Sequence, residues 1–272
     1  MQQRIEDSLF KDIRGQLVFL GTGTSHGVPV IGCDCAVCTS GDPKNQRTRC
    51  SLVLGLPEEN LLVDTSPELR LQLLREGIGR IHAVAYTHGH ADHLFGLDDL
   101  RIFPSYLGGD LPIYCEPAVE QQIRLAFSYA FDPEVQQYPA GGVPKLRFSP
   151  LRPGVPITIL GENILPIRLE HGRYQVLGFR IGQIAYCTDT SGIPPESWPL
   201  LQGLEVLILD GLRWEPHPTH LHLEAAVALA QKLGARRTLL THICHHLDHQ
   251  QTNARLPPGM ELAYDGLRIP LQ

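Results

Sequence analysis

Hydrophobic segments long enough to span a bilayer are absent from the 272-residue sequence. The N-terminal stretch MQQRIEDSLFKDIRGQ is polar and of mixed charge, unlike the apolar core of a secretory signal peptide. The seven cysteines are odd in number, which does not suit a framework of paired disulfides. We therefore predict a cytoplasmic protein with no membrane partner, whose thiols stay reduced and available to a metal.

An excess of basic residues is also lacking. The net charge is −6, with 23 Lys and Arg against 29 Asp and Glu. An extended nucleic-acid-binding surface is therefore not favoured, although Arg47, Arg49 and Arg213 remain candidates for local phosphate contacts. The segment GTGTSHG lacks the G-x-G-x-x-G spacing before a clear helix, and no G-x-S-x-G occurs. The sequence predicts neither a dinucleotide site nor a serine hydrolase.

What the sequence does contain is a series of short apolar, β-branched runs, bounded by Gly, Pro, Asp or His and typical of strands. They lie at 17–20, 51–54, 61–63, 83–86, 164–169, 184–187, 206–209 and 238–240. Helices are predicted at 67–76, capped by Ser66, at 118–131, and at 223–233, closed by Gly234. The stretch 103–156 is rich in Gly and Pro, which predicts irregular structure. This even distribution favours one compact unit of sheets covered by helices.

Several of these predicted strands end at a polar side chain, which predicts a common site at one edge of the sheets. The residues concerned are Asp64, His88, His171, Asp189, Asp210 and His242.

The run HGHADH follows one of these strands and places three imidazoles and a carboxylate within six positions. These are the usual ligands of catalytic zinc and related divalent metals. The spacing of His88 and His90 sends both side chains to one side of an extended backbone. Asp92 and His93 are adjacent and need a different backbone direction, which favours a second metal.

The run alone cannot complete two coordination shells, so the strand-end residues His171, Asp189 and His242 are candidates for the remaining ligands. A carboxylate can bridge two metals about 3.5–4 Å apart. With Asp189 as the bridge, His88, His90 and His171 surround one metal, and Asp92, His93 and His242 surround the other. Zinc and manganese both fit this ligand set.

A second metal site is predicted in the run CDCAVC, where Cys33, Cys35 and Cys38 suit one tetrahedral zinc that lacks a fourth ligand. Candidates for the fourth ligand are the side chains of residues 241–246, which include Cys244, His245 and His246.

The HGHADH run followed by His171, Asp189 and His242 resembles the metallo-β-lactamase superfamily, and the resemblance spans nearly the whole chain. It implies an α/β (α+β) fold, a four-layer αββα sandwich formed by one domain over residues 1–272, with a dinuclear metal site at the sheet edge. It also implies that Asp64 supports the metal-binding loop.

Within that superfamily, the CxCxxC loop after the first strand resembles the phosphodiesterase branch that opens cyclic phosphates in bacterial phosphonate breakdown. The resemblance implies that His245 completes a structural zinc site with the three cysteines, with Cys244 and His246 as substitutes. It also implies that His220, which precedes a late helix, meets the scissile phosphate. Asp210 is a candidate to orient His220.

The predicted function is hydrolysis of a small, cyclic phosphodiester by two divalent metals, zinc or manganese, with Asp92, Asp189 and His220 as catalytic residues. A general-acid role suits His220. Three alternatives stay open: a tRNA 3′-processing nuclease, which would bind nucleic acid; an accessory protein of quinone-cofactor biosynthesis; and a non-catalytic, zinc-stabilised binding module. The oligomeric state is left open by the sequence, and a homodimer is one assembly that suits a small enzyme.

Overall fold

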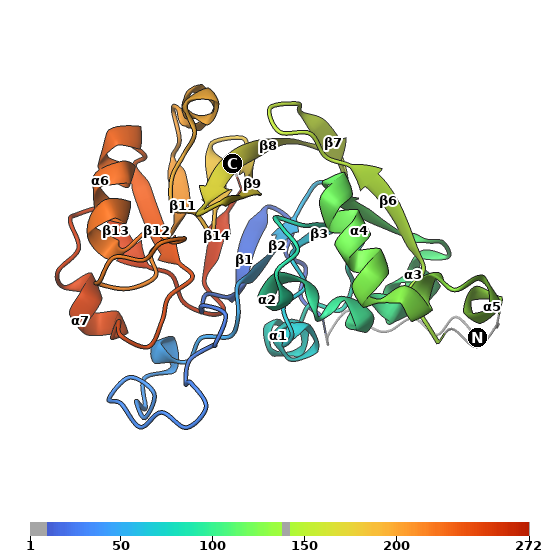
Figure 1. Ribbon diagram of the computed structural model, residues 1–272, viewed down its shortest axis with the longest axis horizontal. Coiled ribbons are helices and arrows are strands. Elements are labelled where there is room, and N and C mark those ends of the chain that lie inside the picture. The colour runs from blue at the N-terminus through green and yellow to red at the C-terminus, as the bar shows by residue number, and fades with distance from the viewer. Residues whose placement is uncertain (1–9, 138–141, 272) are drawn as a thin grey trace.

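Two seven-stranded sheets lie at the centre of the computed structural model, which describes residues 10–137 and 142–271 (Figure 1). The first sheet contains, in spatial order, β14 (Arg268–Pro270), β1 (Gln16–Gly21), β2 (Ser51–Gly55), β3 (Asn60–Val63), β4 (Ala83–Ala85), β5 (Leu111–Cys115) and β6 (Leu146–Pro150). The second contains β13 (Met260–Leu262), β12 (Arg237–Thr241), β11 (Val206–Asp210), β10 (Ile184–Cys187), β9 (Tyr174–Ile181), β8 (Glu162–His171) and β7 (Ile157–Ile159).

Both sheets follow the same plan, with one parallel half and one antiparallel half. Strands β3 to β6 pair in parallel in the first sheet, and β10 to β13 do so in the second. The other pairs in each sheet are antiparallel.

The sheets pack face to face because successive side chains of a strand point to opposite faces. In β1, Leu17 and Phe19 join the apolar core between the sheets, whereas Val18 and Leu20 join the core under the helices. In β11, Ile208 faces the first sheet. The layers are therefore set by the alternation of apolar residues.

Helices cover the outer face of each sheet (Figure 1). The first sheet is covered by α1 (Leu69–Glu76), α2 (Ala91–Leu94), α3 (Phe103–Leu107), α4 (Pro117–Ala126), α5 (Pro133–Gln136) and the 3₁₀ segments η2 (Leu97–Ile102) and η3 (Ser128–Phe131). The second is covered by η4 (Pro195–Leu201) and α6 (Leu223–Leu233). The remaining elements are η1 (Pro43–Asn45) and α7 (His249–Asn253). The predicted αββα architecture is confirmed.

The predicted elements agree with this fold, with three corrections. The stretch 103–156 is more regular than predicted, since it holds α3, β5, α4, α5 and β6, although 138–141 lie outside the described residues. The helix predicted at 118–131 ends at Ala126 and continues as η3. Ser66 does not cap α1, because its hydroxyl donates to Gln72 Oε1 at 2.9 Å and the helix begins at Leu69.

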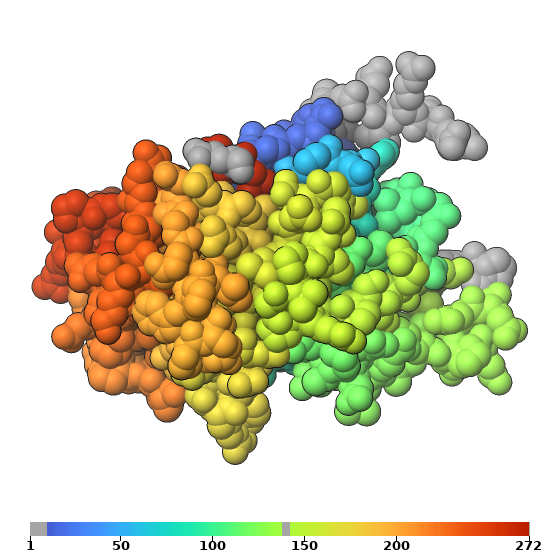
Figure 2. All heavy atoms as spheres, turned by 90° about the horizontal axis from the view of Figure 1, so that it is seen from above, coloured from blue at the N-terminus to red at the C-terminus, as the bar shows by residue number. Residues whose placement is uncertain are grey.

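Segments from the C-terminal part and from the middle of the chain lie at opposite ends of the molecule, although β14 returns to pair with β1 in the first sheet. In Figure 2, segments from the C-terminal part (orange and red) occupy one end and the green segments of the middle of the chain occupy the other.

None of the helices that the structure describes has the length and hydrophobicity needed to cross a membrane.

Candidate metal centre

The strand-end residues predicted to gather do lie together, at the edge where the parallel strands of both sheets end. The turn after β4 carries His88, β8 ends at His171, and Asp189 and His242 follow β10 and β12. Candidate ligand atoms lie within 4.8 Å of one another in two main groups. The first contains His88, His90 and His171, and the second contains Asp92, His93, Asp189 and His242.

Three residues at these strand ends have a left-handed backbone. Their φ angles are 62° at Asp64, 52° at Asp189 and 59° at His242. A left-handed conformation outside glycine costs about 1–3 kcal/mol and persists only where the surroundings enforce it. Each lies just beyond a buried strand, where this turn places its side chain in the site rather than along the strand. The left-handed conformation thus raises the local backbone energy, and in return it directs these side chains into the site.

The first group leaves imidazole nitrogens directed at a common space. His171 Nδ1 lies 2.8 Å from the carbonyl oxygen of Thr219, so Nδ1 carries the proton and Nε2 is a free acceptor. His88 Nδ1 is 3.0 Å from Thr87 Oγ1, and the buried His88 Nε2 has no hydrogen-bond partner among the described residues. Free, buried acceptors of this kind suit a cation.

The second group places two imidazoles on the two oxygens of one carboxylate. His93 Nε2 lies 3.1 Å from Asp189 Oδ2, and His242 Nε2 lies 3.1 Å from Asp189 Oδ1. Asp92 Oδ2 lies farther away, 3.5 Å from His93 Nε2 and 3.6 Å from His242 Nε2. Neither imidazole Nε2 forms a directed hydrogen bond within the described residues.

Asp189 also belongs to the first group's surroundings. One of its oxygens lies within 4.8 Å of ligand atoms of His171 and His220. Its side chain therefore lies between the two groups, where the sequence places a bridging carboxylate.

The charges of the buried site favour a cation. Although burial alone would raise the pKa of Asp189, the facing His242 and His93 hold the pKa of this carboxyl well below its usual range. Burial opposes the charged form of His93, yet Asp189, Asp92 and Asp64 raise the pKa of its imidazole well above its usual value. In His88, which lacks such a carboxylate partner, burial lowers the pKa. The carboxylates thus stabilise positive charge.

These residues fit a pair of divalent metals. The buried side-chain nitrogens left without a hydrogen bond among the described residues include His88 Nε2, His93 Nε2 and His242 Nε2. The last two lie beside Asp189, and His88 Nε2 lies among the ligand atoms of His90 and His171. An unpaired buried polar atom costs about 1–3 kcal/mol. Metal coordination would satisfy all three, and the mixture of imidazole and carboxylate is the donor set of zinc and similar ions.

Asp64 fastens the loop that carries the HGHADH run. Its Oδ1 accepts the backbone N–H of Thr87 and its Oδ2 accepts the Thr87 hydroxyl, both at 2.8 Å. Oδ2 also lies 2.8 Å from His93 Nδ1. This contact directs the opposite ring nitrogen of His93 to the site, as carboxylates behind metal-binding histidines do.

His220 lies at the same edge and is oriented by Asp210. His220 Nδ1 donates to Asp210 Oδ2 at 2.7 Å, and the backbone N–H of Thr190 donates to the same oxygen at 2.9 Å. The ring of His220 stacks on that of His242 with a centroid distance of 4.6 Å. Burial raises the pKa of Asp210, although the contact with His220 opposes this rise. The contact by which Asp210 was predicted to orient His220 is therefore present.

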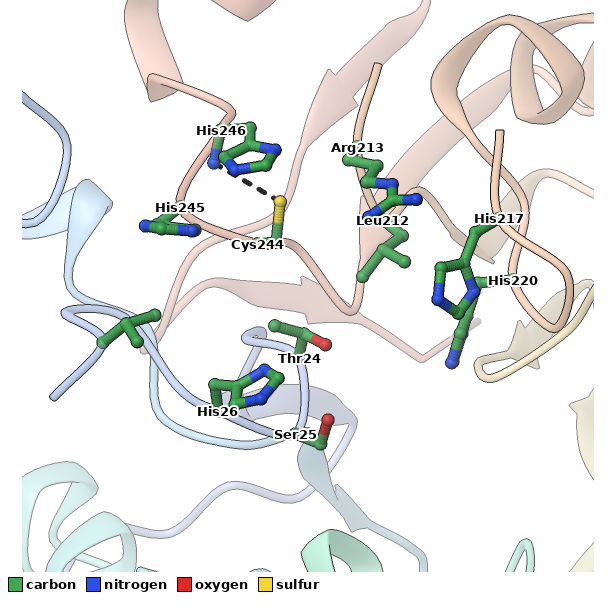
Figure 3. A pocket seen from close by; sticks show the side chains of 11 residues that line it. Thr24, Ser25, His26, Leu212, Arg213, His217, His220, Cys244, His245 and His246 are labelled. Atoms are coloured by element: carbon green, nitrogen blue, oxygen red, sulfur yellow. Dashed lines mark hydrogen bonds between the residues drawn. The ribbon is translucent and has the colours of Figure 1, made fainter. Parts of the chain in front are cut away.

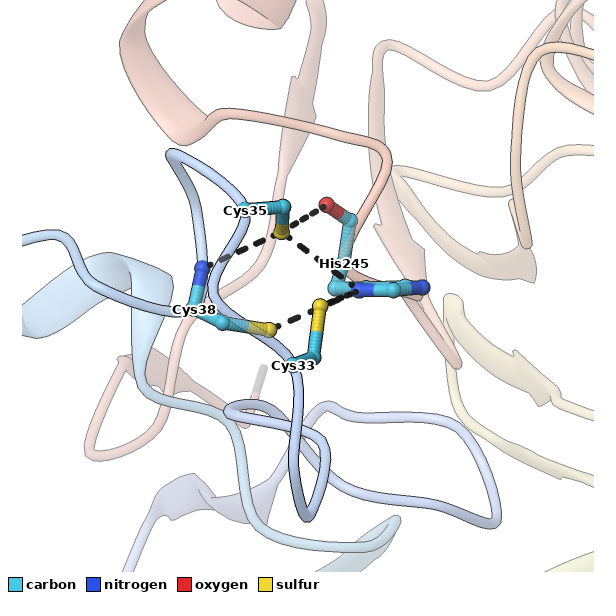
Figure 4. A group of neighbouring side chains, drawn as sticks. All are labelled: Cys33, Cys35, Cys38 and His245. Atoms are coloured by element: carbon cyan, nitrogen blue, oxygen red, sulfur yellow. Dashed lines mark hydrogen bonds between the residues drawn. The ribbon is translucent and has the colours of Figure 1, made fainter.

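The cysteine loop forms a separate cluster with His245. In Figure 4 the side chains of Cys33, Cys35, Cys38 and His245 point toward one another. The Sγ atoms lie 3.2, 3.5 and 3.5 Å from His245 Nδ1. Three thiols around one imidazole nitrogen fit a tetrahedral zinc.

The alternative fourth ligands lie elsewhere. Cys244 is buried, and its Sγ accepts the backbone N–H of His246 at 3.3 Å. The His246 side chain is half exposed and faces Glu215 at 3.7 Å. The structure thus places His245, and neither neighbour, at the cysteines.

Two of the arginines considered for phosphate contacts have structural roles instead. Arg47 is buried, which lowers the pKa of its guanidinium to about 10. It donates to the carbonyl oxygens of Cys244 and Leu247, and so holds the loop that carries His245. Arg49 pairs with Glu68. A charged residue that joins two loops cannot be told from a ligand-binding one by sequence.

Arg213 remains beside the site, together with a histidine that sequence reasoning missed. His217 lines the same cavity as Arg213 and His220. Its ring centroid is 5.2 Å from that of His220. The only signal in the sequence was its place three residues before His220, in a segment without a strand or helix pattern.

Comparison with known proteins identifies the family. The model of a family described as "Beta-lactamase superfamily domain" matches residues 59–243, more than half of the chain. The chain belongs to this superfamily. It is a metal-dependent hydrolase with the metallo-β-lactamase fold, as the sequence predicted.

The chain is similar to proteins of differing description. A solved structure described as a new diphosphatase from the PhnP family is 42% identical with a TM-score of 0.87, over 94% of this chain and 98% of that one. An octanoyltransferase of Porphyromonas gingivalis is 37% identical over 253 residues, 92% of this chain and 50% of that protein. The chain therefore spans about half the length of that relative.

Zn²⁺-bound PqqB from Methylobacterium extorquens has a TM-score of 0.74 at 19% identity, over 94% of this chain and 100% of that one. At this identity the likeness shows the fold alone.

Proposed function

We propose that the protein is a phosphodiesterase that hydrolyses a small phosphodiester at a dinuclear metal site. The observation that carries the proposal is the placement of Asp189 between two groups of unpaired imidazole nitrogens, with His220 beside them. The similarity to a PhnP-family diphosphatase supports a substrate with a scissile bond at phosphorus. A cyclic phosphodiester, as predicted from the sequence, belongs to this class.

In this proposal, His88, His90 and His171 would hold one metal, Asp92, His93 and His242 would hold the other, and Asp189 would contribute its carboxylate to both. Two divalent metals, zinc or manganese, would supply Lewis acidity toward phosphate oxygens and lower the pKa of water. Cys33, Cys35, Cys38 and His245 would hold a structural zinc that ties the cysteine loop to the loop after β12.

His220 is placed to give a proton to the leaving oxygen. Its Nδ1 donates to Asp210, so a second proton, on Nε2, can be directed at the reacting group. The side chain is 11% exposed, which permits contact with substrate while limiting competition from water. Asp210 fixes the direction of the ring through its contact with Nδ1.

Two alternatives share the fold. A tRNA-processing nuclease would need a basic surface for its RNA, which a net charge of −6 does not favour. The chain is 27% identical over 228 residues to a coenzyme PQQ synthesis protein B, but the intact HGHADH run favours hydrolysis here. A binding module has no need of the unpaired ligand atoms around Asp189.

Residues 1–272 are proposed to form a single domain, because the two sheets share one apolar core. Assembly as a homodimer and residence in the cytoplasm stay predictions.

The test compares two substrates with different leaving groups. We expect metal-loaded protein to cleave bis(p-nitrophenyl) phosphate and a 2′,3′-cyclic nucleotide. His220→Asn should lower kcat by about 10²–10⁴-fold for the cyclic nucleotide, whose alkoxide needs a proton, and much less for p-nitrophenolate. Lack of cleavage of both substrates, and of pre-tRNA, by folded protein with its full metal content would refute the proposal.

A further inference from the structure

A series of neighbouring rings leads from His220 past the candidate metal centre to an exposed tyrosine. The ring centroids of His220 and His171 are 4.7 Å apart, and those of His171 and His90 are 5.2 Å apart. Tyr174 comes next, with its ring centroid 5.9 Å from that of His90 and an angle of 87° between the two rings. Tyr174 therefore lies beside a proposed metal ligand, with the rings of two such ligands between it and His220.

The hairpin of β8 and β9 places Tyr174 on the same face as His171. The two residues are partners in the antiparallel register, at the end of the hairpin. Residues directly opposite each other in such a pair lie on the same face of a sheet. Two positions back along each strand, the partners Leu169 and Val176 occupy that face and are buried in the apolar core that includes α6. The register thus directs Tyr174 to the site, because His171 points there.

The tip of this hairpin is held in place although it is exposed. The backbone N–H of Gly172 donates to Ser191 Oγ at 3.0 Å. Gly172 has a φ of 60°, and a Cβ there would lie 2.6 Å from Thr219 Cγ2. Glycine thus lets the tip pack against the segment between β11 and α6. A fixed tip presents Tyr174 in one position, which limits the entropy lost when a ligand binds.

Packing within the protein does not explain an aromatic side chain at position 174. Tyr174 is 48% exposed and belongs to none of the three apolar cores of the described residues. Its hydroxyl accepts a hydrogen bond from Arg173 Nη2 at 2.7 Å, and the guanidinium carbon lies 5.0 Å from the ring centroid. This contact orients the ring without burying it. An oriented, exposed aromatic ring beside a catalytic centre suits a planar group of the substrate.

The side of the site at His220 is built differently. Figure 3 shows Arg213, His217 and His220 around a cavity, and its lining contains no Phe, Tyr or Trp. Because His220 is proposed to protonate the leaving oxygen, the leaving group belongs on that side. The two ester groups of a phosphodiester lie on different sides of phosphorus, so the group that stays on phosphorus is directed away from His220, toward Tyr174.

We infer that Tyr174 stacks on a nucleobase carried by the ester group that stays on phosphorus, so that the preferred substrate is a nucleoside phosphodiester. This inference rests on the proposed phosphodiesterase function. Base–aromatic stacking accepts every base, because each base has a π-face. Tyr174 selects the substrate and contacts it without taking part in bond cleavage.

The reaction balances without a further co-reactant. The oxygen of water bonds to phosphorus, and the bond from phosphorus to the leaving oxygen breaks. The leaving oxygen keeps the electron pair and receives a proton from His220, which recovers one from the proton that water loses. A nucleoside monophosphate remains beside Tyr174.

The experiment compares two substrates that share p-nitrophenolate as the leaving group. Thymidine 5′-(p-nitrophenyl) phosphate keeps a nucleoside on phosphorus, whereas methyl p-nitrophenyl phosphate keeps a methyl group. In the metal-loaded protein, Tyr174→Ala should lower kcat/KM for the thymidine ester by roughly 5- to 150-fold, as expected for loss of one base–aromatic stack. The loss for the methyl ester should stay below about threefold, because a methyl group does not reach Tyr174.

Two further variants and a binding measurement sharpen this comparison. Tyr174→Phe keeps the ring and should keep most of the preference for the thymidine ester. Tyr106→Ala removes a tyrosine of similar exposure, 49%, from α3 and should change neither rate. The Kd of thymidine 5′-monophosphate, measured by calorimetry, should rise in Tyr174→Ala by a factor similar to the loss of kcat/KM, and should stay unchanged in Tyr106→Ala.

Three results would overturn the inference. If Tyr174→Ala lowers kcat/KM for both esters equally, Tyr174 only orders His90, and the metal content of the variant should then fall as well. The inference is also wrong if Tyr174→Ala affects neither ester, or if the unmodified protein does not prefer the thymidine ester. Failure of the unmodified, metal-loaded protein to cleave either ester would instead refute the proposed function.

Discussion

The two candidate metal clusters of this molecule are built in different ways. The His/Asp centre draws its residues from the last residue of β8 and from the turns after β4, β10 and β12 in two sheets, and most of them are buried. The cysteine cluster takes three of its four residues from the short loop 33–38, which is partly exposed and lies outside any strand. The sheets position the first cluster, whereas the second has no such support.

This difference separates their expected roles. Unpaired ligand atoms around Asp189 leave the first cluster open toward His220 and the cavity, so it suits chemistry. In the second, the three thiols converge on one nitrogen of His245, so a metal there would be enclosed. His242 and His245 belong to one loop, through which the cysteine cluster can stabilise the centre.

The largest expected effect is at Asp189. Asp189→Asn keeps the side-chain shape and tolerates the left-handed backbone, but removes the charge that faces His93 and His242. We expect kcat to fall by more than about 100-fold. Catalytic metal content should fall while one zinc per chain remains. Asp110→Asn, at an exposed site, is the control. If Asp189→Asn kept its full metal content and activity, Asp189 would not hold the catalytic metals and the proposed difference between the clusters would be wrong.

A smaller loss is expected at Asp210, which orients His220. Asp210→Asn should lower kcat/KM by roughly 10- to 100-fold, the usual effect of removing a carboxylate behind a functional histidine, without loss of metal. In a double-variant cycle, Asp210→Asn should add little to His220→Asn, because the two side chains act together. Additive losses would show that Asp210 acts through something other than His220.

Replacement of a cysteine should affect stability more than chemistry. Cys35→Ser should remove one zinc per chain and leave the catalytic metals, measured by elemental analysis. If the change costs about 2 kcal/mol, Tm would fall by roughly 4–8 °C in a chain of this size. Asp34→Ser, an exposed change in the same loop, should alter neither value. Simultaneous loss of all metal would contradict two separate clusters.

The smallest expected effect is the pH dependence of stability that His249 causes. Burial, with Lys44 and Arg47 nearby, lowers the pKa of His249 from 6.5 to about 4. Between these values the unfolded chain binds the extra proton, so the free energy of unfolding falls as pH drops, by at most about 1.4 kcal/mol per pH unit for one group. His249→Gln should make urea stability less dependent on pH between 6.5 and 4. An unchanged slope would show that His249 titrates normally.

Strands and helices were predicted correctly where a local pattern of apolar residues marks them, and they were missed where no such pattern exists. The strand 184–187 and the helix 223–233 have the predicted bounds, because their apolar periodicity and flanking residues suffice. Strand β5 was hidden by Pro112, and β13 and β14 have only three residues each. In β9, Gly178 interrupts the run of apolar side chains by which a strand is recognised in a sequence. The fold requires glycine at this position, because a Cβ there would lie 2.7 Å from the carbonyl oxygen of Tyr186.

The sequence by itself determined the donor atoms of this protein. Cys33, Cys35 and Cys38 are adjacent in the chain, as are the residues of the HGHADH run, so their chemistry is legible without a fold. Only the tertiary structure decided which distant residues meet them. It placed His245 at the thiols, Asp189 between the imidazoles, and Arg213 and His217 in a cavity beside His220. The physical reason is that the strands, through their register and the left-handed turns that follow them, bring together residues that no local pattern connects.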